Sequence, residues 1–183
     1  WSLQELYGNF TGIDYNYFIG ILRIIIEKIN RDILLIPHVI SPYESDNDYV
    51  LIKKIFDRLP DEMKKRVKIA DCNKGYLGIK SEISGCDLII TARMHCGLSA
   101  IHENIPTVFI SYSQKSVGMC EYIYGTKKFV VSFEKLGNFV SENIVSIVNK
   151  KEIISEKLKI KNADIVNDFR RNLNKIKKSE CRG

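Results

Sequence analysis

Residues 88–95 read LIITARMH, and residues 105–110 read IPTVFI. Each stretch is an apolar run that leads into a polar segment, which is typical of a buried parallel strand followed by a helix. The first run leads to Arg93 and His95, and the second leads through residues 111–114 to Lys115. In open parallel sheets the ligand crevice lies outside the carboxyl ends of the strands. We therefore expect these three side chains to meet at one sheet edge, where they form a candidate site for a small, doubly anionic substrate.

The same alternation of strand and helix continues in both directions from these stretches. Short apolar runs predict strands at residues 33–36, 67–70, 88–91, 107–110 and 129–131. Helical spacing predicts a helix capped by Asp14 and ending near residue 29, and further helices at residues 48–59, 76–84, after 95, and at 116–124. This pattern indicates a doubly wound, Rossmann-like parallel sheet of the α/β class, with helices on both faces. We expect residues 1–140 to form this domain, residues 141–178 to form a helical segment packed on it, and residues 179–183 to form a frayed tail.

Composition excludes several classes of protein. The chain has 183 residues, 45% of them hydrophobic, and a net charge of +6, as an ordinary globular domain with an anionic partner would have. Its five cysteines are odd in number and form no CxxC pair, so we expect free thiols in a reducing compartment and no metal site. No apolar run of about 20 residues and no signal peptide is found, and the first residue is Trp, as in a trimmed or excerpted chain. We expect a cytoplasmic location and no nucleic-acid partner.

The residue types at the two strand ends suit an anion. A helix start offers unpaired N–H groups and partial positive charge, and an arginine before it adds a planar fork for carboxylate or phosphate. His95 can donate a proton near neutral pH, Gly97 keeps the next turn small, and Lys115 supplies a point charge. The alternative is structural, because Arg93 and His95 could merely cap a helix or pair with Asp87.

Other candidates have two interpretations each. His38 follows a predicted strand by two residues, so it either helps to bind an acceptor, with Asp46 or Asp48 nearby, or is a loop residue bonded to the backbone. Tyr112 either stacks on a sugar or covers the core. His102 lies in mid-helix, where a packed or exposed role is favoured over a functional one. The basic tail from Lys175 to Lys178 is either a solvated face or a contact for an anionic surface.

Taken together, these motifs resemble those of the polysaccharide pyruvyl transferase family. The resemblance is carried by residues 86–95 (CDLIITARMH), Ala100, residues 105–108 (IPTV), residues 112–115 (YSQK) and Gly118, with residues 36–38 (IPH) and the acidic loop after them upstream. It extends from about residue 14 to residue 178.

The resemblance implies a fold similar to that of two-domain glycosyltransferases of the GT-B type, of which this chain would be the C-terminal, donor-binding half, with the other wall of the cleft outside this chain. It implies transfer of the enolpyruvyl carbons of phosphoenolpyruvate onto two hydroxyls of a glycan sugar, forming a pyruvate ketal and releasing phosphate. His95 and Arg93 would be catalytic, without a cofactor or a metal. The acceptor would be a glycan or a lipid-linked sugar, with association to a membrane-bound glycan assembly, and the oligomeric state is open. The remaining expected substrate contacts are Lys115, Tyr112, Met94, Gly97 and His38.

Two other functions fit parts of the pattern. A nucleotide-sugar glycosyltransferase or epimerase domain would bind its donor through a Glu and a Gly-rich loop near the same strand ends. Glu103 is the only acidic residue of the helix after the motif, and no GxGxxG occurs. A non-catalytic domain that binds anionic glycan is the third interpretation, and it requires no cleft.

Overall fold

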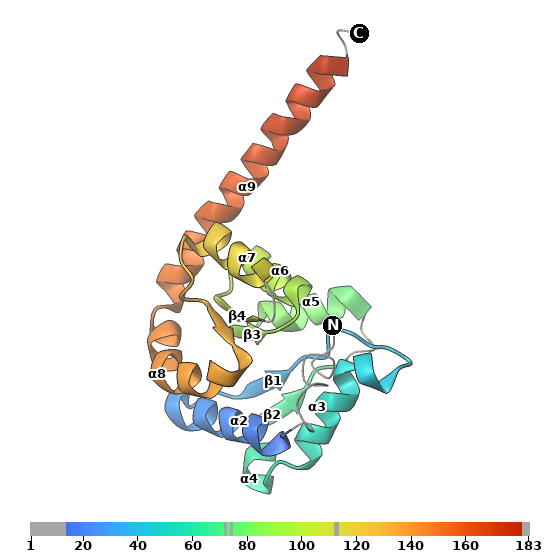
Figure 1. Cartoon of the computed structure of the whole chain (residues 1–183), viewed down its shortest axis with the longest axis vertical. Coiled ribbons are helices and arrows are strands. Elements are labelled where there is room, and N and C mark those ends of the chain that lie inside the picture. The colour runs from blue at the N-terminus through green and yellow to red at the C-terminus, as the bar shows by residue number, and fades with distance from the viewer. Residues whose placement is uncertain (1–13, 72, 74, 112–113, 181–183) are drawn as a thin grey trace.

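The computed structural model describes residues 14–71, 73, 75–111 and 114–180, apart from the side chains of residues 45 and 174–180. Within these residues the chain is an α/β protein with parallel strands, and a long C-terminal helix projects from its body (Figure 1). The strands are β1 (Ile33–Leu35), β2 (Val67–Ile69), β3 (Ile89–Thr91), β4 (Thr107–Ser111) and β5 (Val130–Ser132). The helices are α2 (Tyr15–Ile29), α3 (Asp48–Asp57), α4 (Asp61–Lys64), α5 (Gly75–Ser84), α6 (Met94–His102), α7 (Gln114–Tyr124), α8 (Leu136–Asn149) and α9 (Lys151–Glu180), with 3₁₀ turns η1 (Glu44–Asp46) and η3 (Phe133–Lys135).

The predicted strands and helices are confirmed in type and approximate position. Asp14 caps α2 as expected, because its Oδ1 atom accepts hydrogen bonds from the N–H groups of Asn16 at 2.9 Å and Tyr17 at 3.3 Å. Two elements differ from expectation. The single-turn helix α4 follows Pro60 in a stretch for which no element was predicted, and α8 begins at Leu136, before the start predicted for the helical segment at residue 141.

The strands form two parallel sheets, and the expectation of one continuous sheet is wrong in this respect. β1 pairs with β2, and a separate sheet has the order β3-β4-β5. The backbone of β1 bonds on one side to β2, since the Ile33 N–H donates to Arg66 and the Leu35 C=O accepts from Ala70. Toward β3 the contact is made by side chains instead: Leu34 and Ile36 pack on a buried cluster that includes Ile89 of β3. Sequence patterns report which residues are buried, and packing of this kind buries them without a backbone ladder.

An apolar cavity of about 600 Å³ lies between the two sheets. Its walls include β1, β3 and the inner faces of α2 and α3. Asp48 and Arg93 also line it. The cavity therefore borders the residues that follow the carboxyl ends of β1 and β3.

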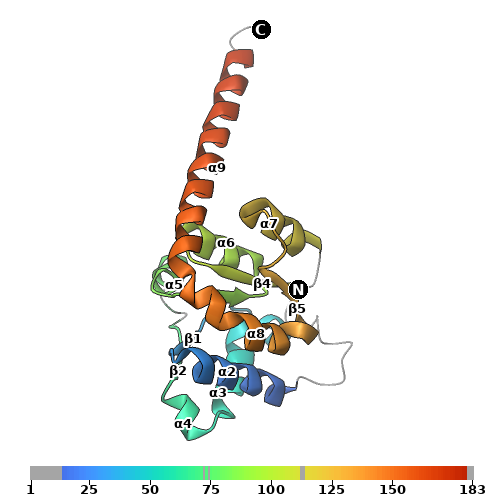
Figure 2. The ribbon, with the colours of Figure 1, turned by 90° about the vertical axis from the view of Figure 1, so that its left-hand side faces the viewer.

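Helices cover both faces of the β3-β4-β5 sheet, as predicted. On β4 the side chain of Val108 packs on α2 and α8, and that of its neighbour Phe109 packs on α6, α7 and α9. Alternate residues of a strand point to opposite faces, so this strand is buried on both sides. Figure 2 shows α8 and α2 side by side below the sheet, and α6 and α7 above it. This doubly covered sheet carries the candidate site at its carboxyl edge.

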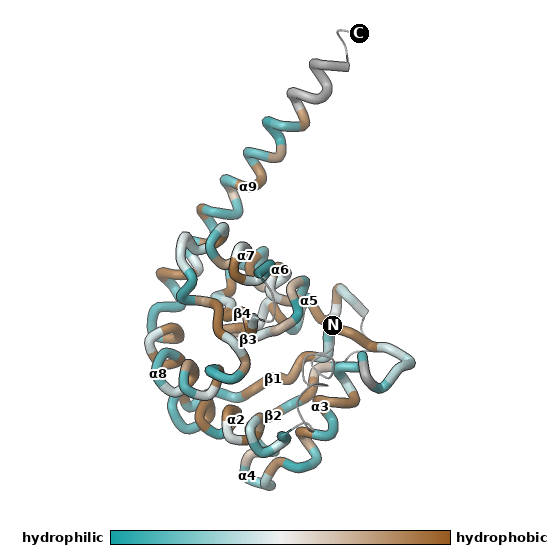
Figure 3. Tube along the Cα trace, viewed as in Figure 1, coloured by the Kyte–Doolittle hydropathy of each residue, from teal (hydrophilic) through white to brown (hydrophobic). Residues whose placement is uncertain are grey.

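The first part of α9 packs on the body, and the rest extends away from it in both views (Figures 1 and 2). Leu158 is 1% exposed, whereas Phe169 is 63% exposed. Apolar and polar residues alternate along the projecting part (Figure 3). The described part of α9 thus changes from a core helix to a solvated one within about three turns.

Candidate functional site

Arg93 and His95 lie at the junction of β3 and α6. Thr91, the last residue of β3, accepts a hydrogen bond through its Oγ1 atom from the Arg93 N–H at 3.0 Å. This short side-chain turn ends the strand and places Arg93 at the N-cap of α6, where its C=O accepts the first helical bond from Gly97. His95 is the second residue of the helix and is exposed. Both residues therefore occupy the carboxyl edge of the β3-β4-β5 sheet, as predicted.

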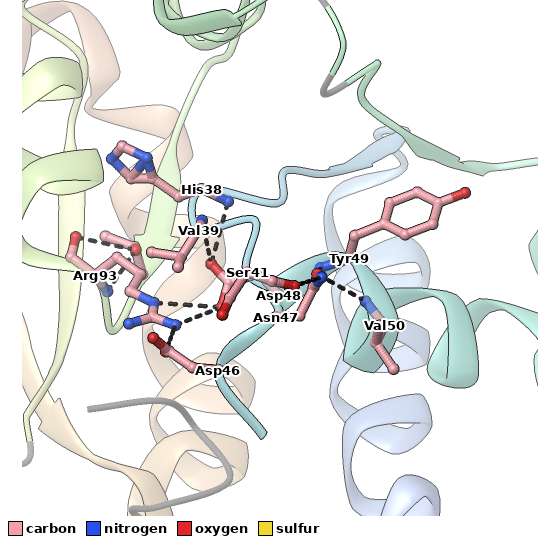
Figure 4. Close-up of polar contacts among 10 residues, drawn as sticks. His38, Val39, Ser41, Asp46, Asn47, Asp48, Tyr49, Val50 and Arg93 are labelled. Atoms are coloured by element: carbon pink, nitrogen blue, oxygen red, sulfur yellow. Dashed lines mark hydrogen bonds and ion pairs between the residues drawn. The ribbon is translucent and has the colours of Figure 1, made fainter. Parts of the chain in front are cut away.

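The Arg93 guanidinium is held by two carboxylates from the loop after β1. Its Nη2 atom lies 2.7 Å from Asp48 Oδ1 and 3.1 Å from Asp46 Oδ1, and its Nε atom lies 3.3 Å from the same Asp48 oxygen (Figure 4). Burial by itself lowers the pKa of Arg93, but the hydrogen bonds to Asp48 and Asp46 raise it above its ordinary value. The side chain remains a cation and has a fixed orientation.

Asp48 connects the two sheets. Its Oδ2 atom accepts hydrogen bonds from the N–H groups of His38 at 3.1 Å and Val39 at 2.9 Å, while its Oδ1 atom faces Arg93 (Figure 4). Asp48 can occupy this place because Asn47 caps α3 and makes Asp48 the first helical residue, where a carboxylate is favourable. One carboxylate thus joins the segment after β1 to the segment after β3.

His38 lies beside this ion pair and is affected by it. Desolvation lowers the pKa of His38, the charges of Arg93 and His95 lower it further, and Asp48 opposes them. The Nε2 atom of His38 is buried and makes no hydrogen bond within the described part of the chain. His38 is therefore a neutral imidazole at neutral pH, and it lies close enough to His95 for a charge on that ring to disfavour protonation of His38.

The remaining predicted substrate contacts include an exposed residue, two residues packed in the core, and one residue outside the described part of the chain. Lys115 is exposed in the first turn of α7. This helix follows β4, which pairs with β3, so Lys115 comes after the neighbouring strand as predicted. Met94 packs on the apolar cluster under α6. Gly97 is buried, and a Cβ atom there would lie 2.2 Å from Phe109 Cε1, so core packing accounts for this glycine without any ligand. Tyr112 lies outside the described residues.

Sequence patterns alone missed the partner of Arg93. The alternative pairing with Asp87 is not found: Asp87 lies 2.5 Å from Lys151 and 3.5 Å from Arg31. The sequence suggests Asp46 and Asp48 only as neighbours of His38. Their position after β1, at the same carboxyl edge as Arg93, is the signal that could have indicated this ion pair. His102 is exposed at the C-terminal end of α6 and lies 3.2 Å from Glu103, and its exposure is one of the two placements predicted for it.

Three further properties concern the described part of the chain. Over residues 14–71, 73, 75–111 and 114–180, no group of three or more His, Cys, Asp and Glu side chains is arranged to hold a metal ion. None of the described helices combines the length and the apolar character needed to cross a membrane. The described thiols of Cys86, Cys96 and Cys120 are free.

The described residues form a parallel α/β domain that carries a cation and a histidine at the carboxyl edge of a sheet, where open parallel sheets bind their ligands. Comparison with protein families gives the particular family. The model of the polysaccharide pyruvyl transferase family matches residues 5–114, more than half of the chain, and the protein belongs to this family. The match includes His38, Asp48, Arg93 and His95 and ends one residue before Lys115. Searches of curated proteins and of solved structures found no match.

Proposed function

We propose that this chain supplies the donor-binding side of a polysaccharide pyruvyl transferase that uses phosphoenolpyruvate and forms a pyruvate ketal. The observation that carries the proposal is the junction of β3 and α6, where an oriented arginine and an exposed histidine lie within the segment that matches the family. In this proposal the chain is the C-terminal half of a two-domain enzyme of the GT-B type.

The charges around this junction suit a donor that carries a carboxylate and a phosphate. The N-terminus of α6 and the residue Arg93 both lie at the carboxyl edge of the sheet, and helix N–H groups and a guanidinium both favour an anion. Lys115 lies in the first turn of the helix after the neighbouring strand and adds a third positive group. We assign the donor carboxylate and phosphate to these three groups jointly.

The reaction requires a proton at carbon before any new bond to oxygen. His95, as imidazolium, donates its proton to the methylene carbon of phosphoenolpyruvate, which becomes a methyl group and leaves an oxocarbenium centre at C2. One sugar hydroxyl attacks C2 and loses its proton. The C2–O bond to phosphate then breaks, the second hydroxyl attacks the new cation to close the ketal, and its proton leaves with the released phosphate. Arg93 and Lys115 stabilise the negative charge of the departing phosphate.

His38 suits the complementary role of a base. Its pKa is lowered by burial and by the neighbouring cations, so the imidazole is neutral and can accept a proton from the attacking hydroxyl. Its buried Nε2 atom has no hydrogen-bond partner among the described residues, as a group awaiting an acceptor hydroxyl would. One histidine that donates and one that accepts a proton are the pair that this reaction needs.

The test separates donor binding from chemistry. Calorimetry should detect binding of phosphoenolpyruvate, but not of UDP- or GDP-sugars, to the wild-type chain, and the Arg93→Gln variant should weaken this binding. His95→Asn should retain donor binding and lose phosphate release in the presence of a polysaccharide acceptor and the rest of the enzyme. His102→Asn is the matched control, because it removes an exposed histidine at the other end of the same helix. Binding of a nucleotide sugar in place of phosphoenolpyruvate would refute the proposal.

A further inference from the structure

The two carboxylates on Arg93 differ in how firmly they are held. Asp48 has a side chain that is 12% exposed, and its two oxygens receive hydrogen bonds from Arg93 and from two backbone N–H groups. Asp46 has a side chain that is 47% exposed, and its contact with Arg93 is a single one, 3.1 Å to Nη2. We infer that Asp46 occupies the position of the donor anion on Arg93 and is displaced when the donor binds, whereas Asp48 stays and positions the guanidinium. This inference rests on the proposed role of Arg93.

The loop geometry permits the movement of one carboxylate without the other. Asp48 closes the base of the loop, since its own N–H donates to the Val39 C=O at 2.9 Å while its carboxylate accepts from the Val39 N–H. Asp46 is the last residue of the short 3₁₀ turn η1, outside this closed base. A rotation of the Asp46 side chain therefore exchanges one partly exposed ion pair for solvation in water, at a small cost.

Removal of Asp48 has a different consequence. In an Asp48→Asn variant one carboxylate oxygen becomes an NH₂ donor, so the remaining oxygen can accept from Arg93 or from the N–H groups of His38 and Val39, but not from both. Buried donors without acceptors are costly, so the loop would rearrange and the guanidinium would lose its orientation. Asp48 is thus a positioning residue, and Asp46 is a competitor of the ligand.

The two roles predict opposite effects of two chemically identical substitutions. Asp46→Asn removes the competing charge and should tighten binding of phosphoenolpyruvate and of inorganic phosphate about two- to fivefold, the range expected for one partly exposed ion pair. Asp48→Asn should weaken the binding of both about fivefold or more, because the guanidinium is no longer held in place. A competitor acts only where Arg93 is present, so Asp46→Asn should have no effect on affinity in an Arg93→Gln background.

Glu44→Gln is the matched control for charge. Glu44 begins the same 3₁₀ turn and pairs with Lys54, so this variant changes net charge and loop composition as Asp46→Asn does, and leaves Arg93 untouched. We expect its affinity for both anions to equal that of the wild type. Amide NMR spectra of all variants would show whether the fold persists.

The outcomes separate this inference from the proposed function. One possible result is that Asp46→Asn binds phosphate more tightly, in a manner that depends on Arg93, while phosphoenolpyruvate does not bind. This result would support the displacement of the Asp46 carboxylate and refute phosphoenolpyruvate as the donor. An Asp46→Asn affinity equal to that of Glu44→Gln overturns the inference, as does an Asp48→Asn variant that is folded and binds as the wild type does. The inference also fails if neither the wild type nor Asp46→Asn binds any anion.

Discussion

Substitution of Gly97 by alanine tests directly whether α6 is positioned by its packing on β4. An added Cβ atom would lie 2.2, 2.8 and 3.2 Å from three ring carbons of Phe109, and 2.2 Å is shorter than any normal contact. Phe109 is buried between α6, α7 and α9, so its ring has little space into which it could move. Overpacking of a core costs about 1–3 kcal/mol, and so severe an overlap belongs at the upper end.

Helix propensity acts in the opposite direction. Alanine is favoured over glycine in a helix by about 1 kcal/mol, so we expect Gly97→Ala to lower the free energy of unfolding by about 2 kcal/mol net. Gly118→Ala is the matched control, since Gly118 lies in α7 with no atom within 4 Å of the added Cβ, and it should raise that free energy by about 0.5–1 kcal/mol. Urea unfolding measures both values.

The double variant Gly97→Ala with Phe109→Leu should recover part of the lost unfolding free energy, because the smaller side chain removes the clash. Equal stability of Gly97→Ala and Gly118→Ala would refute the packing role.

Three further predictions concern α9, His38 and the thiols. In α9, Leu158→Ala should cost about 2–5 kcal/mol of unfolding free energy because the side chain is buried, whereas Phe169→Ala should cost less than about 0.5 kcal/mol because it is exposed, both read by urea unfolding. The lowered pKa of His38 means that its contribution to stability is intact above the unfolded value of about 6.5 and is lost as pH falls toward the lower folded pKa. Between pH 7 and 5.5 the wild type should therefore lose more stability than His38→Gln, and parallel curves would contradict the burial of this ring. Burial raises the pKa of Cys96 to about 11 and also raises that of Cys120, so both thiols should react with Ellman's reagent at pH 8 only after unfolding, and rapid labelling of the native chain would show that they are accessible.

Local patterns were sufficient for the elements of secondary structure and for the location of the candidate site. The apolar runs at residues 33–36 and 107–110 are strands because both of their faces are buried, and burial is what such runs report. Arg93 and His95 were found because the rule for parallel sheets links a position in the chain to a position in space. Asp14 was found because capping depends on residues two and three positions away.

Features that depend on distant segments were beyond such patterns. The ion pair between Arg93 and Asp48 joins residues 45 positions apart, and no periodicity encodes it. The separation of β1 from β3 depends on how Leu34 and Ile36 pack on another sheet. The role of Gly97 could not be separated from ligand approach until the ring of Phe109 was located against it.

The most direct test of the central claim uses the three histidines of the chain as reporters. Their ring C–H signals can be followed by NMR during a titration with phosphoenolpyruvate, and single substitutions assign them. A donor bound between Arg93, the start of α6 and Lys115 should shift the signals of His95 and His38 with one common affinity and leave that of His102 unchanged. Unchanged signals of His95 and His38 at saturating phosphoenolpyruvate would contradict the assignment of this site.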